Sequence, residues 1–164
     1  MQLRTITPCL WFDGQAEEAA NFYTGIFKNS KIVGVTRYTD AGQEVHGGKP
    51  GSVMVVAFEL DGQSFTALNG GPLFKFNEAV SFQIHCRSQE EVDHYWSKLS
   101  AGGDPAAQQC GWLKDKFGLS WQVVPLVLLE MLNDRDAAKV RRVTEAMLRM
   151  KKLDIPALQR AYVG

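Results

Sequence analysis

Apolar and polar residues alternate over several short stretches of the chain, whereas longer stretches repeat apolar residues every three or four positions. Residues 6–12, 80–86 and 119–124 alternate, which predicts strands with one face against a core. Residues 15–27 and 90–101 carry apolar side chains at helical spacing, which predicts two amphipathic helices. The chain therefore combines both periods, as an α+β protein does.

Three further strands are expected between the two helices, over residues 31–38, 53–60 and 63–69. Asp61–Gly62 predicts a tight hairpin between the last two of them. Residues 39–52 contain four glycines and one proline, which is typical of a loop.

The second half of the chain repeats this order of elements. A strand over 80–86 and a helix over 90–101 precede residues 106–110, which are expected to pair as a strand, and a hairpin within residues 111–125. Each half therefore has the form strand, helix, three strands, with a period of about 75 residues.

The chain changes character after Pro125. Residues 126–132, 134–150 and 153–162 are expected to be helices with apolar stripes. A segment this apolar must cover something, and the two possibilities are the helical side of the sheet and a second subunit.

The segment Gly111–Pro125 is the most informative stretch. It predicts two short strands joined by a turn in which Asp115 is a turn residue. In the second strand, Trp121 lies on an apolar face and is expected in the core, whereas Gln122 lies on a mixed face. The alternation predicts a sheet that packs on helices with one face and lines a cleft with the other.

Composition narrows the classes of function. The 164 residues are 45% hydrophobic and 22% charged, which is ordinary for a soluble globular protein. Eighteen basic and eighteen acidic residues give no net charge, so we expect no nucleic-acid partner. No apolar run predicts a membrane span, and residues 1–5 do not resemble a signal peptide. Three cysteines favour reduced thiols and a cytoplasmic location.

The chain resembles a known family at several motifs. These are Phe12–Ala19, Asn21–Tyr23 with Phe27, Ala67–Pro72 and the run from Trp112 to Pro125; residues 147–155 also resemble the ending of this family. The family is the PhnB-like group, often labelled 3-demethylubiquinone-9 3-methyltransferase, of the vicinal-oxygen-chelate superfamily. This superfamily contains glyoxalase I, extradiol dioxygenases and bleomycin-resistance proteins.

The resemblance implies an α+β fold of two βαβββ modules, which form a curved, partly closed mixed sheet with outer helices. We expect a paired domain over residues 1–125, with modules of about 1–75 and 76–125. Residues 126–164 then form a helical C-terminal extension. The resemblance also implies a homodimer, because the superfamily builds its clefts from paired modules.

Chelating members of the superfamily place His, Gln or Glu ligands on strands that face one cleft. By strand phase, these positions correspond here to Thr7, Ser81 and Gln122, and a fourth lies near Phe65 or Thr66. Hydroxyl and amide groups are a poor ligand set for transition metals. We therefore expect no metal and no cofactor.

The same face offers weak candidates for catalysis. His85 is either a cleft acid or base or a strand-end residue half in solvent, and the second interpretation is preferred. Cys9 is either a nucleophile or a small buried residue, and again the second is preferred. His46 in the loop and His94 on the second helix are expected to be solvated.

A ligand-binding role suits the remaining polar and aromatic residues of this face. Trp11 and Trp112 are candidates for an aromatic wall, and Gln122 can donate and accept at once. The expected ligand-binding residues are Thr7, Trp11, Ser81, Gln83, Trp112 and Gln122.

The sequence thus predicts a metal-independent small-molecule-binding protein, and it leaves open whether a reaction is catalysed. Three alternatives remain. They are an enzyme that uses His85 or Cys9, a sequestering protein of the bleomycin-resistance kind, and the methyltransferase of the family label. The last lacks a glycine-rich loop between a strand and a helix that would hold S-adenosylmethionine.

Overall fold

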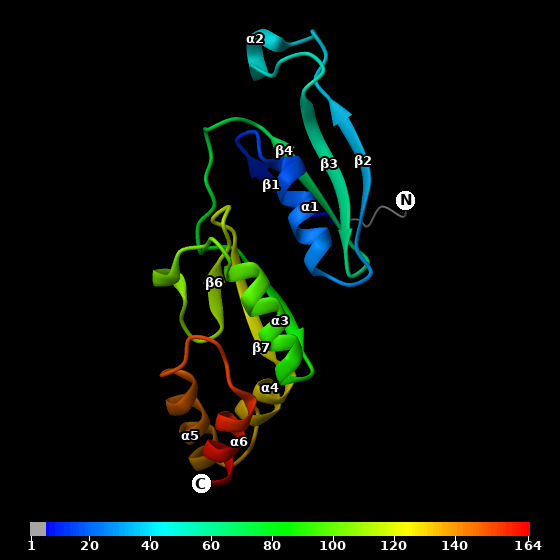
Figure 1. Cartoon of the computed structure of the whole chain (residues 1–164). Helices are drawn as coiled ribbons and strands as arrows, with labels where there is room; N and C mark the ends of the chain where they lie inside the picture. The colour runs from blue at the N-terminus through cyan, green and yellow to red at the C-terminus, as the bar shows by residue number, and fades with distance from the viewer. Residues whose placement is uncertain (1–5) are drawn as a thin grey trace. The chain divides into compact units, whose positions relative to one another are not determined.

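The computed structural model describes residues 6–164, and the chain forms two compact units (Figure 1). Unit 1 is Met1–Phe76 and unit 2 is Asn77–Gly164. Each unit has its own sheet, so the expected α+β class is confirmed, with two open sheets of four and three strands. None of the helices within residues 6–164 is both long enough and apolar enough to cross a membrane.

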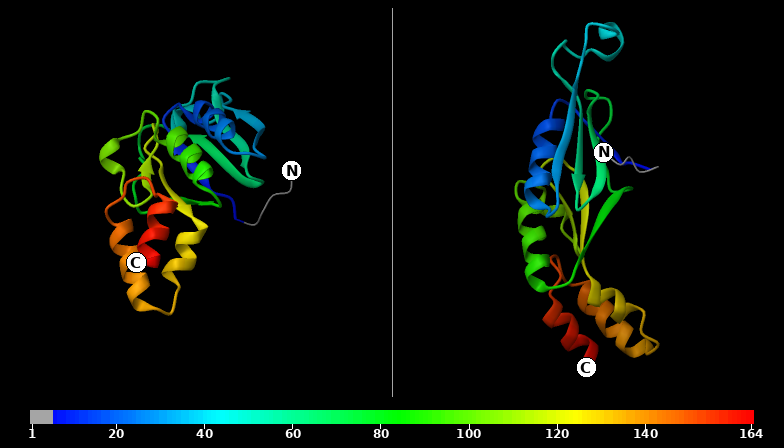
Figure 2. Two further views of the ribbon diagram at one scale, coloured as in Figure 1. Left: turned by 60° about the horizontal axis from the view of Figure 1, so that its bottom comes forward. Right: turned by 90° about the vertical axis from the view of Figure 1, so that its right-hand side faces the viewer.

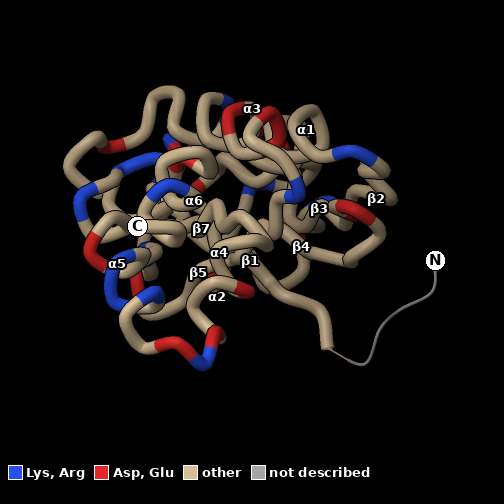
Figure 3. The backbone as a smooth tube through the Cα atoms, turned by 90° about the horizontal axis from the view of Figure 1, so that it is seen from below, with Lys and Arg blue, Asp and Glu red and all other residues tan. Residues whose placement is uncertain are grey.

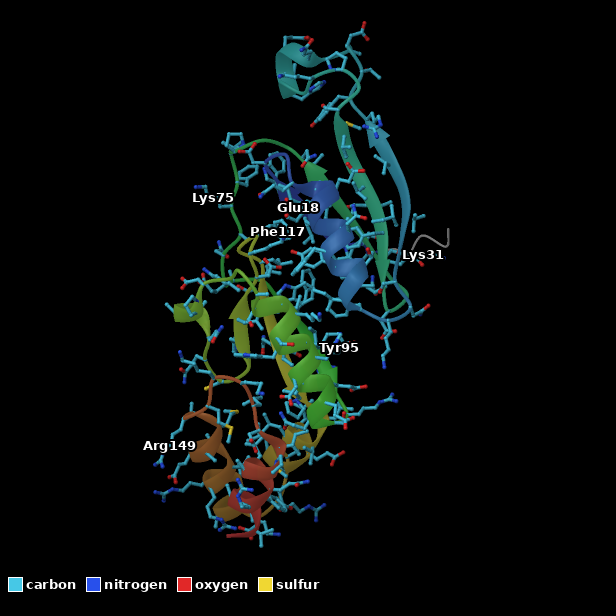
Figure 4. The ribbon with its side chains drawn as sticks, in the orientation of Figure 1. Glu18, Lys31, Lys75, Tyr95, Phe117 and Arg149 are labelled. Atoms are coloured by element: carbon cyan, nitrogen blue, oxygen red, sulfur yellow. The ribbon has the colours of Figure 1, made fainter. Side chains whose placement is uncertain are left out.

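Unit 1 contains a four-stranded mixed sheet in the order β1-β4-β3-β2. Strand β1 runs parallel to β4, and the other two pairs are antiparallel. The elements in chain order are β1 (Cys9–Phe12), α1 (Ala16–Ile26), β2 (Lys31–Arg37), α2 (Gln43–His46), β3 (Val53–Leu60) and β4 (Gln63–Asn69). Figure 4 labels Lys31 at the start of β2, where it pairs with Glu59 of β3.

Helix α1 covers one face of this sheet because its apolar residues lie on one side. Tyr23 is fully buried in α1 and stacks on Phe58 of β3, whose ring stacks in turn on Phe65 of β4. The start of the helix is held from the sheet, because Asn69 Oδ1 accepts a hydrogen bond from the Ala16 N–H group at 2.9 Å.

Unit 2 contains a three-stranded sheet in the order β5-β7-β6, with β5 parallel to β7 and β6 antiparallel to it. Its first elements are β5 (Ser81–Cys86), α3 (Gln89–Ser100), η1 (Pro105–Ala107), β6 (Trp112–Lys114) and β7 (Ser120–Pro125). Helix α3 packs on β6 and β7, as Figure 2 shows. Tyr95 projects from α3, and Phe117 lies in the turn between β6 and β7 (Figure 4).

The expectation of a strand over residues 106–110 is wrong. Pro105 begins a 3₁₀ turn there, and Asp104 caps it by accepting a hydrogen bond from the Ala106 N–H group at 2.8 Å. A single bridge between Gln109 and Trp112 is the remaining pairing. Unit 2 therefore has the strand order of unit 1 without its edge strand β2.

The tail forms three helices, α4 (Leu126–Leu132), α5 (Ala137–Met147) and α6 (Ile155–Val163). Their apolar side chains bury one another in a separate core of Leu128, Met131, Val143, Leu153 and Leu158. The tail therefore does not need the sheet or a second subunit to bury these residues. Its charges are mixed in sign (Figure 3), as the Arg141–Glu145 pair on α5 illustrates.

The tail is attached to unit 2 by backbone and side-chain hydrogen bonds. The N–H groups of Cys110 and Gly111 donate to the carbonyls of Met150 and Lys151, each at 2.8 Å. Gln89 at the start of α3 accepts from the Ile155 N–H group at 2.7 Å.

Candidate functional site

The candidate site in unit 2 is the sheet face that α3 does not cover. Gln122 of β7 lies between Gln83 of β5 and Trp112 of β6 in the strand register. Residues directly opposite on neighbouring strands project from the same face. Gln122 and Trp112 are half-buried and Gln83 is exposed, whereas Trp121 on the opposite face is buried.

The Gln122 amide is held in one orientation by its two neighbours. Its Nε2 donates to Ser81 Oγ at 2.8 Å, and its Oε1 accepts from Gln83 Nε2 at 3.4 Å. A primary amide has two N–H groups and two lone pairs, so one of each stays available to a ligand. The structure therefore brings together Ser81, Gln83, Trp112 and Gln122.

A second row of side chains crosses the same face one step along the strands. Ser120 of β7 lies opposite Ser81 on one side and Lys114 on the other. Lys114 forms an ion pair with Glu78, which precedes β5 at the far edge of this sheet. Since β7 is the central strand, this ion pair joins residues from the two sides of β7.

Ser120 is the unusual member of this row. It is 1% exposed, and within residues 6–164 its Oγ is a buried side-chain oxygen without a hydrogen-bond partner. Sequence analysis placed neither Lys114 nor Glu78 in the site. Lys114 could have been found, because it lies two residues after Trp112 and so has the same strand phase.

His85 lies on the same strand face but apart from these rows. It is exposed, stands opposite Val124, and its ring has no hydrogen-bond partner within residues 6–164. A general acid or base usually has a second group that orients it. His94 is likewise exposed, on α3.

In unit 1, the Trp11 side chain lies on the sheet face opposite α1 and is held in place by two contacts. Its Nε1 donates to the Gly71 carbonyl at 2.8 Å, and its ring meets Phe74 edge-on at a centroid distance of 4.9 Å. A Cβ atom on Gly70 would lie 2.3 Å from the Trp11 ring. The Asn69–Gly70–Gly71 sequence therefore allows the indole to pack against the backbone.

Two other predicted residues of unit 1 lie on this face. Cys9 is exposed, which makes its interpretation as a small buried residue wrong. Thr7 and Thr66 line a cavity of about 20 Å³, which holds no more than a water molecule. Of the two residues considered for the fourth position, Thr66 lies opposite Cys9 on this face, whereas Phe65 is buried in the core.

A larger cavity of about 340 Å³ lies elsewhere in unit 1 and was not anticipated from the sequence. Tyr38, His46 and Asp13 are among its lining residues. The His46 ring stacks on Tyr38 at 4.4 Å, and its Nδ1 accepts from the Gly48 N–H group at 2.9 Å. His46 is exposed, as expected, and its Nε2 lies 3.1 Å from the Ala41 carbonyl oxygen.

The donor groups at the expected chelating positions are hydroxyls and an amide. Ser81 and Gln122 meet in unit 2, and Thr7 belongs to unit 1. Within residues 6–164, no three His, Cys, Asp or Glu side chains are grouped so that they could hold a metal ion. Cys86 is not a candidate ligand either, because burial, together with the nearby Glu91 carboxylate, raises the pKa of its thiol to about 12.

Comparison with solved structures gives the class of the fold. A fosfomycin resistance protein, FosX, from Listeria monocytogenes aligns with 82% of this chain and 100% of its own, with 15% identity and a TM-score of 0.53. Protein PA1353 from Pseudomonas aeruginosa aligns with 75% of this chain and 98% of its own, with 18% identity and a TM-score of 0.56. At these identities the likeness concerns the fold alone.

The family follows from closer matches. A PhnB protein from Bacillus cereus, described as a putative 3-demethylubiquinone-9 3-methyltransferase, is 38% identical, with 74% of this chain and 99% of that chain covered and a TM-score of 0.63. Residues 4–124 match the family described as 3-demethylubiquinone-9 3-methyltransferase. The chain belongs to this PhnB-like family. No curated protein sequence matches it.

The family match ends at residue 124, just before α4 begins at Leu126. The expected resemblance of residues 147–155 to the family ending therefore lies outside the matched region.

Proposed function

We propose that the protein binds a small organic molecule on the open sheet face of unit 2, without a metal ion. The observation that carries this proposal is the Gln122 amide, which Ser81 and Gln83 hold in place beside Trp112. An oriented amide next to an aromatic side chain is the usual composition of a small-molecule site. On the open face of unit 1, where Cys9 also lies, Trp11 and Thr7 are proposed as ligand-binding residues of that unit.

The proposal of metal independence rests on ligand chemistry. Thr7, Ser81 and Gln122 offer neutral oxygen and nitrogen atoms, whereas zinc, nickel and iron sites in proteins use imidazole, thiolate or carboxylate. We expect dialysed protein to carry far less than one equivalent of zinc, nickel, iron or manganese by elemental analysis. A stoichiometric metal that survives dialysis contradicts this part of the proposal.

The methyltransferase in the family description is not the function we propose. Helix α1 begins after Asp13–Gly14–Gln15, and α3 begins after Arg87–Ser88. Neither segment is the glycine-rich loop that usually holds a dinucleotide or S-adenosylmethionine. Methyl transfer from S-adenosylmethionine to a quinol by the purified protein would overturn this interpretation.

We also propose that the protein is a cytoplasmic homodimer. The support for a dimer is the superfamily resemblance. The tail does not add to it, because its apolar residues are buried in their own core. A dimer would bury more than about 1,000 Å² in total. Light scattering at micromolar concentration distinguishes it from a monomer.

The direct test is a ligand screen with matched variants. Mixtures of small metabolites are added to the protein, and binding is detected by ligand-observed NMR. Gln122→Ala and Trp112→Ala should each weaken any hit, whereas Gln43→Ala, on the exposed helix α2, should not. Hits that bind all variants equally would place binding elsewhere. A hit consumed by the wild-type protein but not by His85→Ala or Cys9→Ala would identify an enzyme.

A further inference from the structure

Lys114, Ser120 and Glu78 form an arrangement that packing alone does not explain. The Lys114–Glu78 ion pair joins β6 to the segment before β5, and these two strands flank the central strand β7. Ser120 lies opposite Lys114 in the strand register, and its Oγ is buried and has no hydrogen-bond partner within the described residues 6–164. A buried hydroxyl without a partner is unfavourable, so this group is one that a ligand atom would stabilise.

The two members of the ion pair differ in exposure. The Lys114 side chain is 25% exposed, whereas that of Glu78 is 63% exposed. Glu78 also lies outside the sheet, three residues before β5. An exposed ion pair contributes little to stability, so Glu78 can leave Lys114 at small cost when another carboxylate replaces it.

The row next to Lys114 and Ser120 contains Trp112 and Gln122, which would lie beside a ligand carboxylate bound to Lys114. Gln122 lies two residues after Ser120 on the same face of β7, and Trp112 lies two residues before Lys114 on β6. A ligand whose anionic group reaches Lys114 would therefore have its body over the Gln122 amide and the Trp112 ring. These groups suit a planar or partly apolar body with one polar substituent.

We infer that Lys114 and Ser120 form an anion subsite, which Glu78 occupies in the free protein, and that the ligand is a small organic acid. Its carboxylate replaces that of Glu78 on Lys114 and accepts a hydrogen bond from Ser120 Oγ. This inference rests on the proposed function, because it specifies the ligand class for the same sheet face. Lys114 supplies a point charge rather than a planar fork, which suits a single carboxylate oxygen.

The inference is tested with benzoate and its neutral analogue benzamide as probes. Each is titrated into isotope-labelled protein, and the amide signals of β5, β6 and β7 are followed by NMR. Benzoate is expected to bind more tightly than benzamide. Glu78→Gln removes the competing carboxylate and should tighten benzoate binding by about three- to tenfold, without changing benzamide binding.

Lys114→Met keeps the aliphatic length of the side chain but removes its charge. It should weaken benzoate binding at least about tenfold, and Ser120→Ala should weaken it by a factor of about two to five. The matched control is Lys116→Met, which removes the same charge from an exposed turn residue and should leave both probes unaffected. Unchanged amide spectra of the free variants show that each is folded.

The outcomes separate this inference from the proposed function. If both probes bind alike and neither Lys114→Met nor Glu78→Gln changes benzoate binding, Lys114–Glu78 is a structural ion pair only and the inference is wrong, although binding on this face stands. If neither probe shifts the signals of β5, β6 or β7, the inference is also wrong, and the metabolite screen still decides the proposed function. If Glu78→Gln weakens benzoate binding, Glu78 does not occupy the subsite.

Discussion

Trp121 Nε1 donates a hydrogen bond to Asp115 Oδ2 at 2.9 Å, and both side chains are only 2% exposed. The other carboxylate oxygen of Asp115 accepts from the N–H groups of Phe117 and Leu119 at 2.9 and 3.0 Å. One buried carboxylate therefore closes the turn between β6 and β7 and also positions the core indole. The most distinctive stretch of the sequence is thus a structural element that supports the candidate site.

Asp115 and Trp121 should depend on each other for their contribution to stability. Asp115→Asn keeps the shape of the side chain but replaces one acceptor oxygen with an NH2 group, so either the Trp121 N–H group or the N–H groups of Phe117 and Leu119 face a donor. We expect a loss of about 1–3 kcal/mol from this bond. Trp121→Phe removes the donor, so the two changes together should cost less than the sum of the separate costs.

Urea unfolding of the two single variants and the double variant measures this coupling. A coupling energy of about 0.5–3 kcal/mol is expected for groups in one buried network. If the stability losses of the two single variants add up to that of the double variant, the hydrogen bond between Asp115 and Trp121 contributes no coupling energy to stability.

The two faces of β7 should respond differently to truncation. Trp121 is buried on the helix side, so Trp121→Ala opens a cavity and should cost about 3–5 kcal/mol. Gln122 is half-buried on the open face, and Gln122→Ala should cost at most about 1–3 kcal/mol through its bond to Ser81. The midpoints of urea unfolding compare the two variants. Equal losses, or a larger loss for Gln122, would contradict the placement of the site.

Gly70→Ala should displace Trp11. The new methyl group would lie 2.3 Å from the indole ring, which must move and lose its bond to Gly71. We expect a red-shifted tryptophan emission and a stability loss of about 1–3 kcal/mol. The control is Gly25→Ala in α1, where a Cβ atom meets nothing within 4 Å. It should be neutral or stabilising by about 0.5–1 kcal/mol, since alanine favours helix.

The attachment of the tail should depend on pH at the acid end. A hydrogen bond from Lys152 at 2.5 Å, aided by one from Gln89, lowers the pKa of Asp93 below its usual value of 3.8. A lowered carboxyl pKa stabilises the folded state above the unfolded pKa, and this contribution is lost as the pH falls through the folded pKa.

Lys152→Met should therefore reduce the loss of stability between about pH 5 and pH 2, measured by urea unfolding at each pH. Lys151→Met, at the exposed neighbouring residue, is the charge control and should retain the wild-type acid dependence. Identical curves for the two variants would show that the Asp93–Lys152 pair does not act on stability.

Cys9 and Cys86 should differ in reactivity. Cys9 is exposed, whereas Cys86 is buried, and burial raises the pKa of the Cys86 thiol to about 12. The thiolate is the reactive form, so iodoacetamide at about pH 8 should modify Cys9 and spare Cys86 in the folded protein. Mass spectrometry after a short exposure shows which peptides are labelled. Modification of Cys86 as fast as Cys9 would contradict the burial of β5 against its helix.

The longer helices and most strands could be predicted because each one buries a single face, and that face leaves a regular period in the sequence. The short helix α2 buries no residue and formed within residues 39–52, which were expected to be a loop. Residues 106–110 also differed, since Pro105 and the Asp104 cap impose a local turn on a stretch that looks neutral by period alone. The Asp104 cap and Pro105 therefore favour a 3₁₀ turn where the repeat of the first half had predicted a strand.

The candidate site was partly accessible from strand phase. Phase alone was enough to group Ser81, Gln83, Trp112 and Gln122 on one face. It could not show Glu78, because that residue precedes the strand and reaches Lys114 through its side chain. The cavity beside Tyr38 and His46 depends on how a glycine-rich loop folds back, and such loops leave no periodic signal.

The separate core of α4, α5 and α6 affects the order in which parts of the protein unfold. These helices bury Leu128, Val143 and Leu158 among themselves. Tail residues reach the rest of unit 2 through a small set of bonds at Gln89, Asp93 and the segment Gln109–Gly111. Such a segment can open as one cooperative unit before the sheet does. Its amide protons should then exchange with solvent together, at one shared rate, while those of β7 remain protected.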